Sequence, residues 1–360
     1  MSKAAQPSNV AADALPRTRV PAEWEPQSGA MLTWPHEHSD WATVLPEVEP
    51  VYLALAREIS VRQKLLIVCY DELHVAHVHK RLRASEVNER NVGLYIAPSN
   101  DTWARDHGPI TIDHEGELRL LDFHFNGWGG KYAHALDNAI TRCLHSAGAF
   151  GEIRLDTIDL VLEGGGLEFD GSGTVLATAR SLLTPSRNPG LTQRALERRL
   201  AECLGVKRLL LLRHGGIVGD DTDGHIDTLA RFCDSDTIAY VDGGPADDPQ
   251  RAAREAMAKE LAELRTRAGK PYRLVPLPAP PPIHDGAGRR LPATYANFAL
   301  INGAVLVPVY GADTADALAC ERLAACFPQR RLSPIDARPL IRQLGSLHCA
   351  IMHFPAGVIR

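Results

Sequence analysis

Apolar and polar positions along the chain predict amphipathic helices separated by short strands. Residues 44–63 and 71–83 have the period of amphipathic helices, and residues 65–69 form an apolar run typical of a buried strand. The helical pattern also occurs at residues 133–147, 191–204, 248–268 and 314–326. For the third of these segments we predict Asp248 as the N-cap and Gly269 just beyond the C-terminal end.

Pairs of apolar segments joined by turn residues recur between the predicted helices. The turns lie at residues 114–116, 170–173, 234–236 and 302–303. They are about 55 to 70 residues apart, a spacing typical of repeated supersecondary units. Five such units around an axis would bring five strand ends together, as in a propeller. The pattern predicts an α/β fold, a five-bladed pseudo-symmetric propeller of ββαβ modules, with a doubly wound parallel sheet as the alternative.

Length and composition are typical of one α/β domain. The chain has 360 residues, 45% of them hydrophobic, and a formal net charge of -5. Residues 1–20 predict a flexible arm and residues 21–360 a single propeller domain. The scattered basic residues argue against nucleic acid or an anionic membrane as partners. Since the sequence shows neither a signal-peptide pattern nor an apolar run of membrane-spanning length, we expect a cytoplasmic protein.

The cysteines are irregularly spaced and include no Cys-x-x-Cys pair. They are Cys69, Cys143, Cys203, Cys233, Cys320, Cys326 and Cys349. This pattern indicates free thiols in a reducing compartment, most of them packing residues. Cys349 differs because it precedes the apolar segment 350–354, just as other polar motifs precede the predicted hairpins.

Residues 101–106, Asp-Thr-Trp-Ala-Arg-Asp, place two carboxylates, an indole and a guanidinium close together. The stretch could be a capped turn with a surface ion pair. Alternatively, a carboxylate such as Asp106 beside an aromatic ring such as Trp103 suits a planar cation, because paired hydrogen bonds hold its edge while the ring covers its face.

Residues 220–227, Asp-Asp-Thr-Asp-Gly-His-Ile-Asp, lack the closing glutamate of a calcium loop, and no further ligand of recognisable spacing completes a metal site. In a strand, residues two apart face the same side, so His225 and Asp227 are predicted to point together as an acid/base and anchor pair. By the same rule His348 is expected to point away from the site that Cys349 faces.

Two further segments have alternative interpretations. Glu163 follows an apolar run and would be an acid at the end of a buried strand, for which His225 is a natural partner. The proline-rich residues 276–288 predict a polyproline-type surface connector or a loop over a substrate channel.

Five motifs in order resemble the agmatine deiminase and bacterial peptidylarginine deiminase family of guanidine-modifying enzymes. They are Asp-Thr-Trp-Ala-Arg-Asp-His-Gly-Pro, Leu-Glu-Gly-Gly, Asp-Gly-His-Ile-Asp, Thr-Tyr-Ala-Asn-Phe and Leu-His-Cys. The resemblance runs from about Trp24 to Pro355 and implies the five-bladed α/β propeller (pentein) fold. Two positions depart from the family pattern: residues 350–353 are less polar than usual, and Gly166 stands where arginine deiminases carry an acid.

The resemblance also implies roles for individual residues. Cys349 would be the nucleophile, His225 the general acid/base, and Asp106 and Asp227 the carboxylates that hold a guanidinium. Glu163 would orient the histidine. Trp103 and Asn297 fall in motifs that line the pocket.

The implied reaction converts agmatine to N-carbamoylputrescine and ammonia through an amidino-cysteine intermediate, a step of putrescine biosynthesis. Agmatine is favoured over free arginine because the motifs offer no free cation for an α-carboxylate, whereas Asp220, Asp221 or Asp223 could receive an ammonium, and we select Asp221. No cofactor or metal is expected. The partner is a small cationic guanidine, and a homodimer is a family-level expectation.

Three alternatives remain open. One is a peptidylarginine deiminase or another guanidine deiminase. The second, of another class, is a propeller that binds cationic amines without catalysis. The third is a metal-dependent hydrolase.

Overall fold

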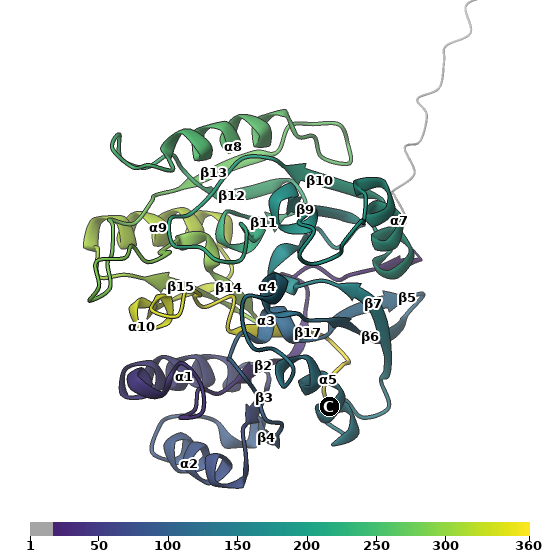
Figure 1. Cartoon of the computed structure of the whole chain (residues 1–360), viewed down its shortest axis with the longest axis vertical. Coiled ribbons are helices and arrows are strands. Elements are labelled where there is room, and N and C mark those ends of the chain that lie inside the picture. The colour runs from purple at the N-terminus through teal and green to yellow at the C-terminus, as the bar shows by residue number, and fades with distance from the viewer. Residues whose placement is uncertain (1–16) are drawn as a thin grey trace, which may run out of the picture.

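The structure, a computed structural model, describes residues 17–360, and its strands form five separate sheets (Figure 1). The first sheet contains β17 (Ile351–Pro355), β2 (Gln27–Thr33), β3 (Lys64–Cys69) and β4 (Val92–Ile96). The second contains β1 (Thr18–Arg19), β5 (Ile110–His114), β6 (Glu117–His124) and β7 (Arg154–Val161). The third contains β10 (Arg208–Leu212), β9 (Thr174–Thr178) and β8 (Glu168–Phe169), the fourth β11 (Ala230–Asp234), β12 (Thr237–Val241) and β13 (Arg273–Leu277), and the fifth β14 (Ala299–Ile301), β15 (Ala304–Val309) and β16 (Arg331–Asp336).

Each sheet repeats one connection pattern. An antiparallel strand pair is followed by a helical crossover to a strand that pairs in parallel. The four predicted hairpins are confirmed, and the fifth antiparallel pair joins β17 at the C-terminal end to β2 at the N-terminal end. The crossover helices are α1 (Leu45–Ser60), α5 (Ile140–Ser146), α7 (Gln193–Leu204), α8 (Arg251–Glu263) and α9 (Asp313–Cys326), and α2 (Glu72–Arg83) connects β3 to β4.

Short helical turns precede the hairpins. They are α3 (Ala104–His107) before β5, η4 (Gly164–Gly166) before β8, η5 (Ile226–Thr228) before β11 and η6 (Tyr295–Asn297) before β14. The other short helices are η1 (Ala42–Val44), η2 (Glu89–Asn91), α4 (Gly127–Gly130), η3 (Asp137–Ala139), α6 (Ala179–Leu182) and α10 (Arg338–Ile341). Residues 347–350 form an equivalent turn before β17.

Three sequence predictions about element ends were wrong. The helix expected at residues 133–147 is confined to η3 and α5. Asp248 does not cap α8, which has Gln250 as its N-cap. Nor does α8 continue to Gly269, because it ends at Glu263. The Asp248 carboxylate instead accepts hydrogen bonds from the Gln250 backbone and binds Arg254 and Arg290.

The N-terminal arm was predicted to extend to residue 20. Thr18–Arg19 form β1, which pairs antiparallel with β5, so the ordered fold includes these residues. Residues 1–16 of the predicted arm lie outside the described part of the chain. Within residues 17–360, no helix combines the length and the apolar character needed to cross a membrane.

The five sheets are tied together by largely buried polar and charged side chains that we call the central ion cluster: Glu23, Arg105, Glu168, Arg231 and His348. The Arg231 side chain is fully buried, and its guanidinium donates to Glu168 Oε2 at 2.6 Å, to Glu23 Oε2 at 2.9 Å and to the Phe298 carbonyl at 2.6 Å. Glu23 Oε1 accepts the Leu300 backbone N–H at 2.7 Å. Arg105 belongs to α3, Glu168 to β8 and Arg231 to β11, while Leu300 lies in β14 and His348 precedes β17. Each sheet or its leading turn therefore contributes one contact to the cluster.

We predict that Arg231→Met lowers the free energy of unfolding by about 3–5 kcal/mol, since it leaves two buried carboxylates without their main cation. Chemical denaturation measures the change. Arg338→Met is the matched control, because Arg338 pairs with Asp336 at the surface and its loss should cost no more than about 1 kcal/mol. Equal losses in the two variants would contradict the importance of the cluster.

Candidate active site

The predicted site residues converge from the turns that precede the hairpins. Asp106 lies in α3, Glu163 precedes η4, His225 precedes η5 with Asp227 inside it, Asn297 ends η6, and Cys349 lies in the turn before β17. All six side chains are buried. The structure thus brings together residues separated by up to 243 positions, as the repeat predicts (349 − 106).

Asp106 is held by two donors. Trp128 Nε1 donates to Oδ2 at 2.9 Å, and the Gly165 backbone N–H donates to Oδ1 at 2.9 Å. Burial, together with the nearby Asp227 and Glu163 carboxylates, raises the pKa of Asp106 despite the opposing effect of His225. The carboxylate therefore lies in an environment that favours a bound cation.

His225 lies between two carboxylates. Its Nδ1 is 3.5 Å from Asp106 Oδ1 and its Nε2 is 3.8 Å from Glu163 Oε2, and neither ring nitrogen has a hydrogen-bond partner among the described residues. Burial lowers the pKa of His225, but Asp106 and Glu163 outweigh burial and raise it to about 9. The imidazole is therefore protonated at neutral pH, and its N–H groups are available to a ligand.

Glu163 is fixed by an arginine that sequence reasoning missed. Arg187 Nε lies 2.8 Å from both Glu163 oxygens, Nη1 contacts Asp223 Oδ2 at 2.8 Å, and Nη2 donates to the Thr222 carbonyl at 2.9 Å. Burial raises the pKa of Glu163, but His225 and Arg187 outweigh burial and lower it. Arg187 thus links the carboxylate beside His225 to the turn at residues 220–223. No motif points to it, because it lies in a connecting segment outside the repeat.

Cys349 is bordered by Asp227 and Asn297. Its Sγ lies 3.6 Å from Asp227 Oδ2 and accepts from Asn297 Nδ2 at 3.2 Å. Asn297 Oδ1 also accepts the Cys349 backbone N–H at 3.2 Å, so one amide side chain fixes both the sulfur and its backbone. Burial, followed by the charges of Asp227 and Asp106, raises the pKa of the Cys349 thiol well above its ordinary value.

A pocket opens above Cys349. Its lining includes Cys349 and Asp106, together with Asp40, Asp101, Asp221, Trp103, Trp128, Tyr132 and Gly345. Trp103 packs against Trp41 with ring centroids 5.6 Å apart, and a Cβ on Gly345 would lie 2.3 Å from the Trp103 ring. Space along the indole therefore depends on glycine at position 345.

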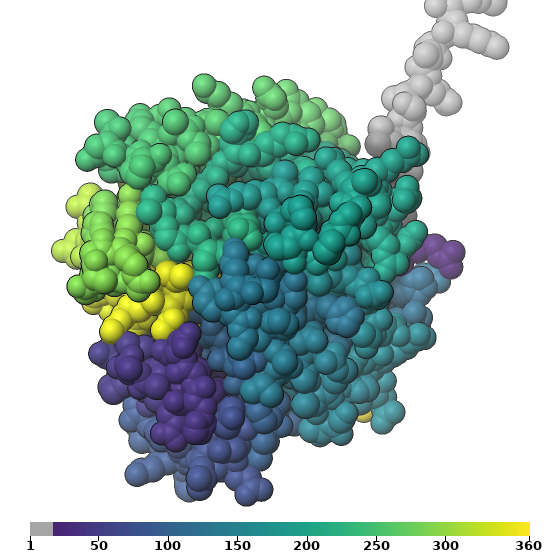
Figure 2. Space-filling view, in the orientation of Figure 1, coloured from purple at the N-terminus to yellow at the C-terminus, as the bar shows by residue number. Residues whose placement is uncertain are grey.

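Figure 2 shows the C-terminal segment, in yellow, packed against the N-terminal segment, in purple.

The predicted acid Asp221 lines this pocket, whereas Asp220 and Asp223 do not. Asp221 Oδ2 accepts from Tyr132 Oη at 2.6 Å, and burial raises the pKa of its carboxyl group. Asp220 accepts from the Thr222 and Gly224 backbone, and Asp223 binds Arg187 and Lys131. Asp221 is thus the member of the trio that faces the pocket.

Two arguments made from strand geometry were wrong. His225 and Asp227 flank and occupy the 3-10 helix η5, so they reach the site through a turn and not through strand alternation. His348 points away from the Cys349 pocket, as predicted, but residues 347–350 form a turn and not a strand. The turn places His348 Nδ1 2.8 Å from Asp227 Oδ2. Among residues 276–288, none lines the Cys349 pocket, which favours the connector interpretation of that segment.

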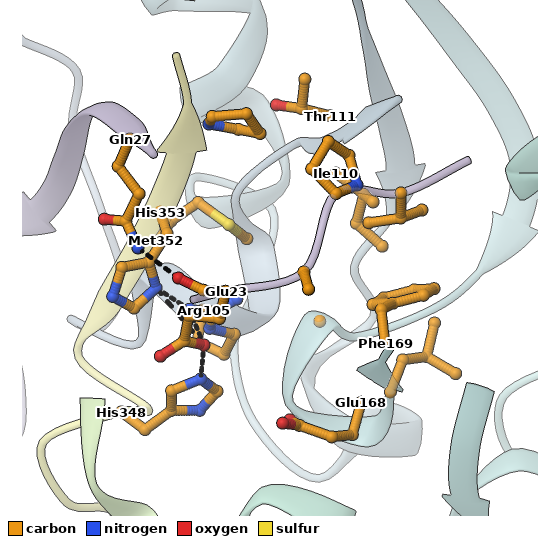
Figure 3. A pocket seen from close by; sticks show the side chains of 16 residues that line it. Glu23, Gln27, Arg105, Ile110, Thr111, Glu168, Phe169, His348, Met352 and His353 are labelled. Atoms are coloured by element: carbon orange, nitrogen blue, oxygen red, sulfur yellow. Dashed lines mark hydrogen bonds and ion pairs between the residues drawn. The ribbon is translucent and has the colours of Figure 1, made fainter. Parts of the chain in front are cut away.

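A second cavity contains a group with metal-ligating atoms. Glu23, His348 and His353 offer ligand atoms within 4.8 Å of one another (Figure 3). Arg105 contacts His353 Nδ1 and lies 3.5 Å from Glu23, and Arg231 lies 2.9 Å from Glu23. Two guanidinium groups already neutralise this carboxylate, so the donor set does not fit a divalent cation.

We predict that Gly165→Ala lowers kcat/KM for the deimination of agmatine at least about 100-fold. Displacement of reacting groups by about 1 Å is enough for such a loss. The added Cβ would lie 2.7 Å from Asp106 Oδ1 and 2.8 Å from His225 Nδ1. Steady-state kinetics measures the loss. Gly286→Ala is the control, since a Cβ there meets nothing within 4 Å. Wild-type kinetics for Gly165→Ala would show that these groups do not need their observed spacing.

We predict that iodoacetamide alkylates Cys349 in the free protein at a rate that still rises with pH above 9. The raised pKa of Cys349 keeps the thiol protonated at neutral pH, and only the thiolate reacts. Mass spectrometry of the peptide that contains Cys349 measures the rate. A plateau below pH 8 would contradict the protonated thiol.

Comparisons with known proteins agree on one family. The model of the Porphyromonas-type peptidyl-arginine deiminase family matches residues 19–355. The chain is 32% identical to a putative agmatine deiminase of Selenomonas ruminantium, with 94% of this chain and 95% of the relative covered.

Two crystal structures show the same fold. A putative arginine deiminase from Porphyromonas gingivalis is 48% identical, with a TM-score of 0.88 and coverage of 95% of this chain and 100% of that one. A cysteine-to-serine variant of C. jejuni agmatine deiminase with substrate bound is 35% identical, with a TM-score of 0.86 and coverage of 95% and 97%. With nearly the whole length matched by the family model, the chain belongs to the Porphyromonas-type peptidyl-arginine deiminase family.

Proposed function

We propose that this protein is an agmatine deiminase, which hydrolyses the guanidinium group of agmatine to give N-carbamoylputrescine and ammonia. One observation carries the proposal: a thiol, an imidazole and two carboxylates lie close together. Cys349 Sγ is 3.6 Å from Asp227, and His225 is 3.5 Å from Asp106. The two carboxylates can accept the N–H groups of a planar guanidinium while the sulfur faces its carbon.

The charge of the substrate supplies what the free site lacks. Burial of the thiol, followed by the Asp227 and Asp106 carboxylates, raises the pKa of Cys349, so the free site holds little thiolate. A guanidinium bound between Asp106 and Asp227 places positive charge beside the sulfur, which favours loss of the thiol proton. The substrate therefore helps to generate the nucleophile that attacks it.

The proposed reaction has two halves. Cys349 Sγ attacks the guanidinium carbon, and the C–N bond breaks as His225 donates a proton to the departing ammonia. A water molecule, deprotonated by His225, then attacks the amidino carbon, and the C–S bond breaks to release the ureido product and the thiol. Glu163, held by Arg187, supports the imidazolium in the first half.

The outer part of the pocket favours an ammonium over a carboxylate. Asp40, Asp101 and Asp221 line it, and burial raises the pKa of Asp101 to about 6. Lys131 could oppose this preference, but its ammonium is 2.9 Å from Asp223 and also contacts the Asp221 carbonyl. The names of similar proteins from S. ruminantium and C. jejuni also point to agmatine.

We further propose that the five sheets are blades of one propeller, and that the product enters putrescine biosynthesis in the cytoplasm.

A second candidate is deimination of arginine, either free or within a peptide. The family model bears the name of peptidyl-arginine deiminases, and the P. gingivalis structure that of a putative arginine deiminase. Ammonia release from agmatine, arginine and a peptide with internal arginine separates the two. We expect agmatine to give the highest kcat/KM, and a preference for either other substrate would refute the choice.

We predict that Cys349→Ser lowers ammonia release from agmatine at least about 1000-fold, because serine is a far weaker nucleophile without a strong base. Mass spectrometry of wild-type enzyme quenched in acid should show agmatine minus ammonia attached to Cys349. Full activity of the serine variant, or chelator-sensitive activity, would refute the covalent mechanism.

We predict that Asp221→Asn raises KM for agmatine about tenfold, since it removes a charge at the outer end of the pocket. n-Butylguanidine, which has the guanidinium but no ammonium, is the matched probe, and its KM should stay unchanged. An equal rise for both compounds would show that Asp221 acts on the pocket structure and not on the ammonium.

A further inference from the structure

Cys349 and His348 face two different cavities. The second cavity, shown in Figure 3, is lined by His348, Glu23, Arg105 and His353, and it shares no lining residue with the Cys349 pocket. His348 and Cys349 are adjacent residues of one turn, yet His348 faces the central ion cluster and Cys349 faces the candidate site. The reaction proposed above assigns no role to His348.

The His348 ring is bonded on both sides by carboxylates. Nδ1 lies 2.8 Å from Asp227 Oδ2, and Nε2 lies 2.8 Å from Glu23 Oε2. The His348 side chain is 1% exposed and that of Asp227 is fully buried, so the bond between them is closed to water, whereas Glu23 is 12% exposed. A neutral imidazole has only one N–H, and it can satisfy only one of two ionised carboxylates.

The surroundings of both carboxylates favour their ionised forms. Burial raises the pKa of Asp227, but His348 and His225 outweigh burial and lower it. Glu23 behaves alike, because His353, Arg231 and His348 outweigh burial and hold its pKa well below the ordinary value. Glu23 Oε2 also accepts from Arg231 at 2.9 Å, whereas Asp227 Oδ1 has no partner among the described residues, so Asp227 depends on hydrogen at His348 Nδ1.

The backbone around His348 is equally fixed. Its N–H donates to Asn297 Oδ1 at 2.9 Å, the same oxygen that accepts the Cys349 N–H. Asn297 Nδ2 also donates to the Asp227 carbonyl at 3.2 Å. The Asn297 side chain therefore ties the His348 and Cys349 backbones to that of Asp227.

Resting on the proposed function, we propose that His348 is a positioning residue: held between Glu23 and Asp227, it donates through Nδ1 to Asp227 Oδ2 and fixes this carboxylate for the guanidinium. Oδ2 lies 3.6 Å from Cys349 Sγ. His348 acts through Asp227 and does not itself line the substrate pocket.

Two substitutions separate the two ring nitrogens. In His348→Asn the amide nitrogen can occupy the place of Nδ1 and still donate to Asp227. In His348→Gln it can occupy the place of Nε2, which preserves the bond to Glu23 and removes the bond to Asp227. Both variants remove the ring, so a purely structural role would affect them alike.

The readout is the ratio of two alkylation rates at Cys349. Chloroacetamidine is a small cation that needs the carboxylates to align it, whereas iodoacetamide is neutral and needs only the sulfur. We expect the rate ratio of chloroacetamidine to iodoacetamide to fall about tenfold or more in His348→Gln, and clearly less in His348→Asn. His353→Gln is the control, because it removes the other histidine beside Glu23 and no bond to Asp227; its ratio should stay within about twofold of wild type.

The outcomes separate the two proposals. If wild-type protein does not prefer chloroacetamidine, the proposed function fails and the inference with it. If wild type shows the preference and His348→Gln retains it, or if both His348 variants lose it equally, only the inference is overturned.

A measurement on wild-type protein protects the test against a variant that does not fold. Nitrogen-15 NMR of histidine-labelled protein should show His348 with hydrogen on Nδ1, and the signal is assigned with whichever His348 variant folds. A His348 ring without hydrogen on Nδ1 overturns the inference.

Discussion

The structure depends on the pairing of Glu23 with Arg231 at the place where the five sheets meet. Charges buried this deeply are tolerated only when each has a partner, since an unpaired ion in the interior costs several kcal/mol. Arg231 satisfies Glu168 and Glu23, and Glu23 in turn accepts from His348 and from the backbone of β14. Elements far apart in sequence must therefore assemble together before any of these charges is compensated. The turns that carry the candidate site are held in place by the same contacts.

The two carboxylates of the site differ because only one of them touches this cluster. Asp227 has His348 directly behind it, which offsets burial and keeps the carboxylate ionised. Asp106 accepts from Trp128 and the Gly165 N–H, and burial raises its pKa although His225 lies 3.5 Å away. A cation held between the two carboxylates thus adds most beside Asp106, because the pKa of Asp227 is already lowered. The site is asymmetric although the repeat that builds it is regular.

This contrast also explains what the sequence could predict. Hairpins and crossover helices follow from local patterns, and the motifs before each hairpin identified Asp106, His225 and Cys349 as residues that come together. Arg187 lies outside the repeat, and its partners are defined only by the folded chain. The bond between His348 and Asp227 was missed because a turn, and not a strand, sets the direction of that side chain. Local periodicity predicts elements, whereas partners across the centre of the fold require the structure.

The protonation of the free site restricts which molecules can react. Burial and then the nearby carboxylates raise the pKa of the Cys349 thiol, and carboxylates outweigh burial to raise that of His225 to about 9, so the resting site contains a thiol and an imidazolium. The nucleophile is then weak until positive charge arrives between Asp106 and Asp227. A neutral urea or amide of similar shape could occupy the pocket and still leave the sulfur protonated. The charge of the ligand, more than its shape, therefore decides whether Cys349 becomes reactive.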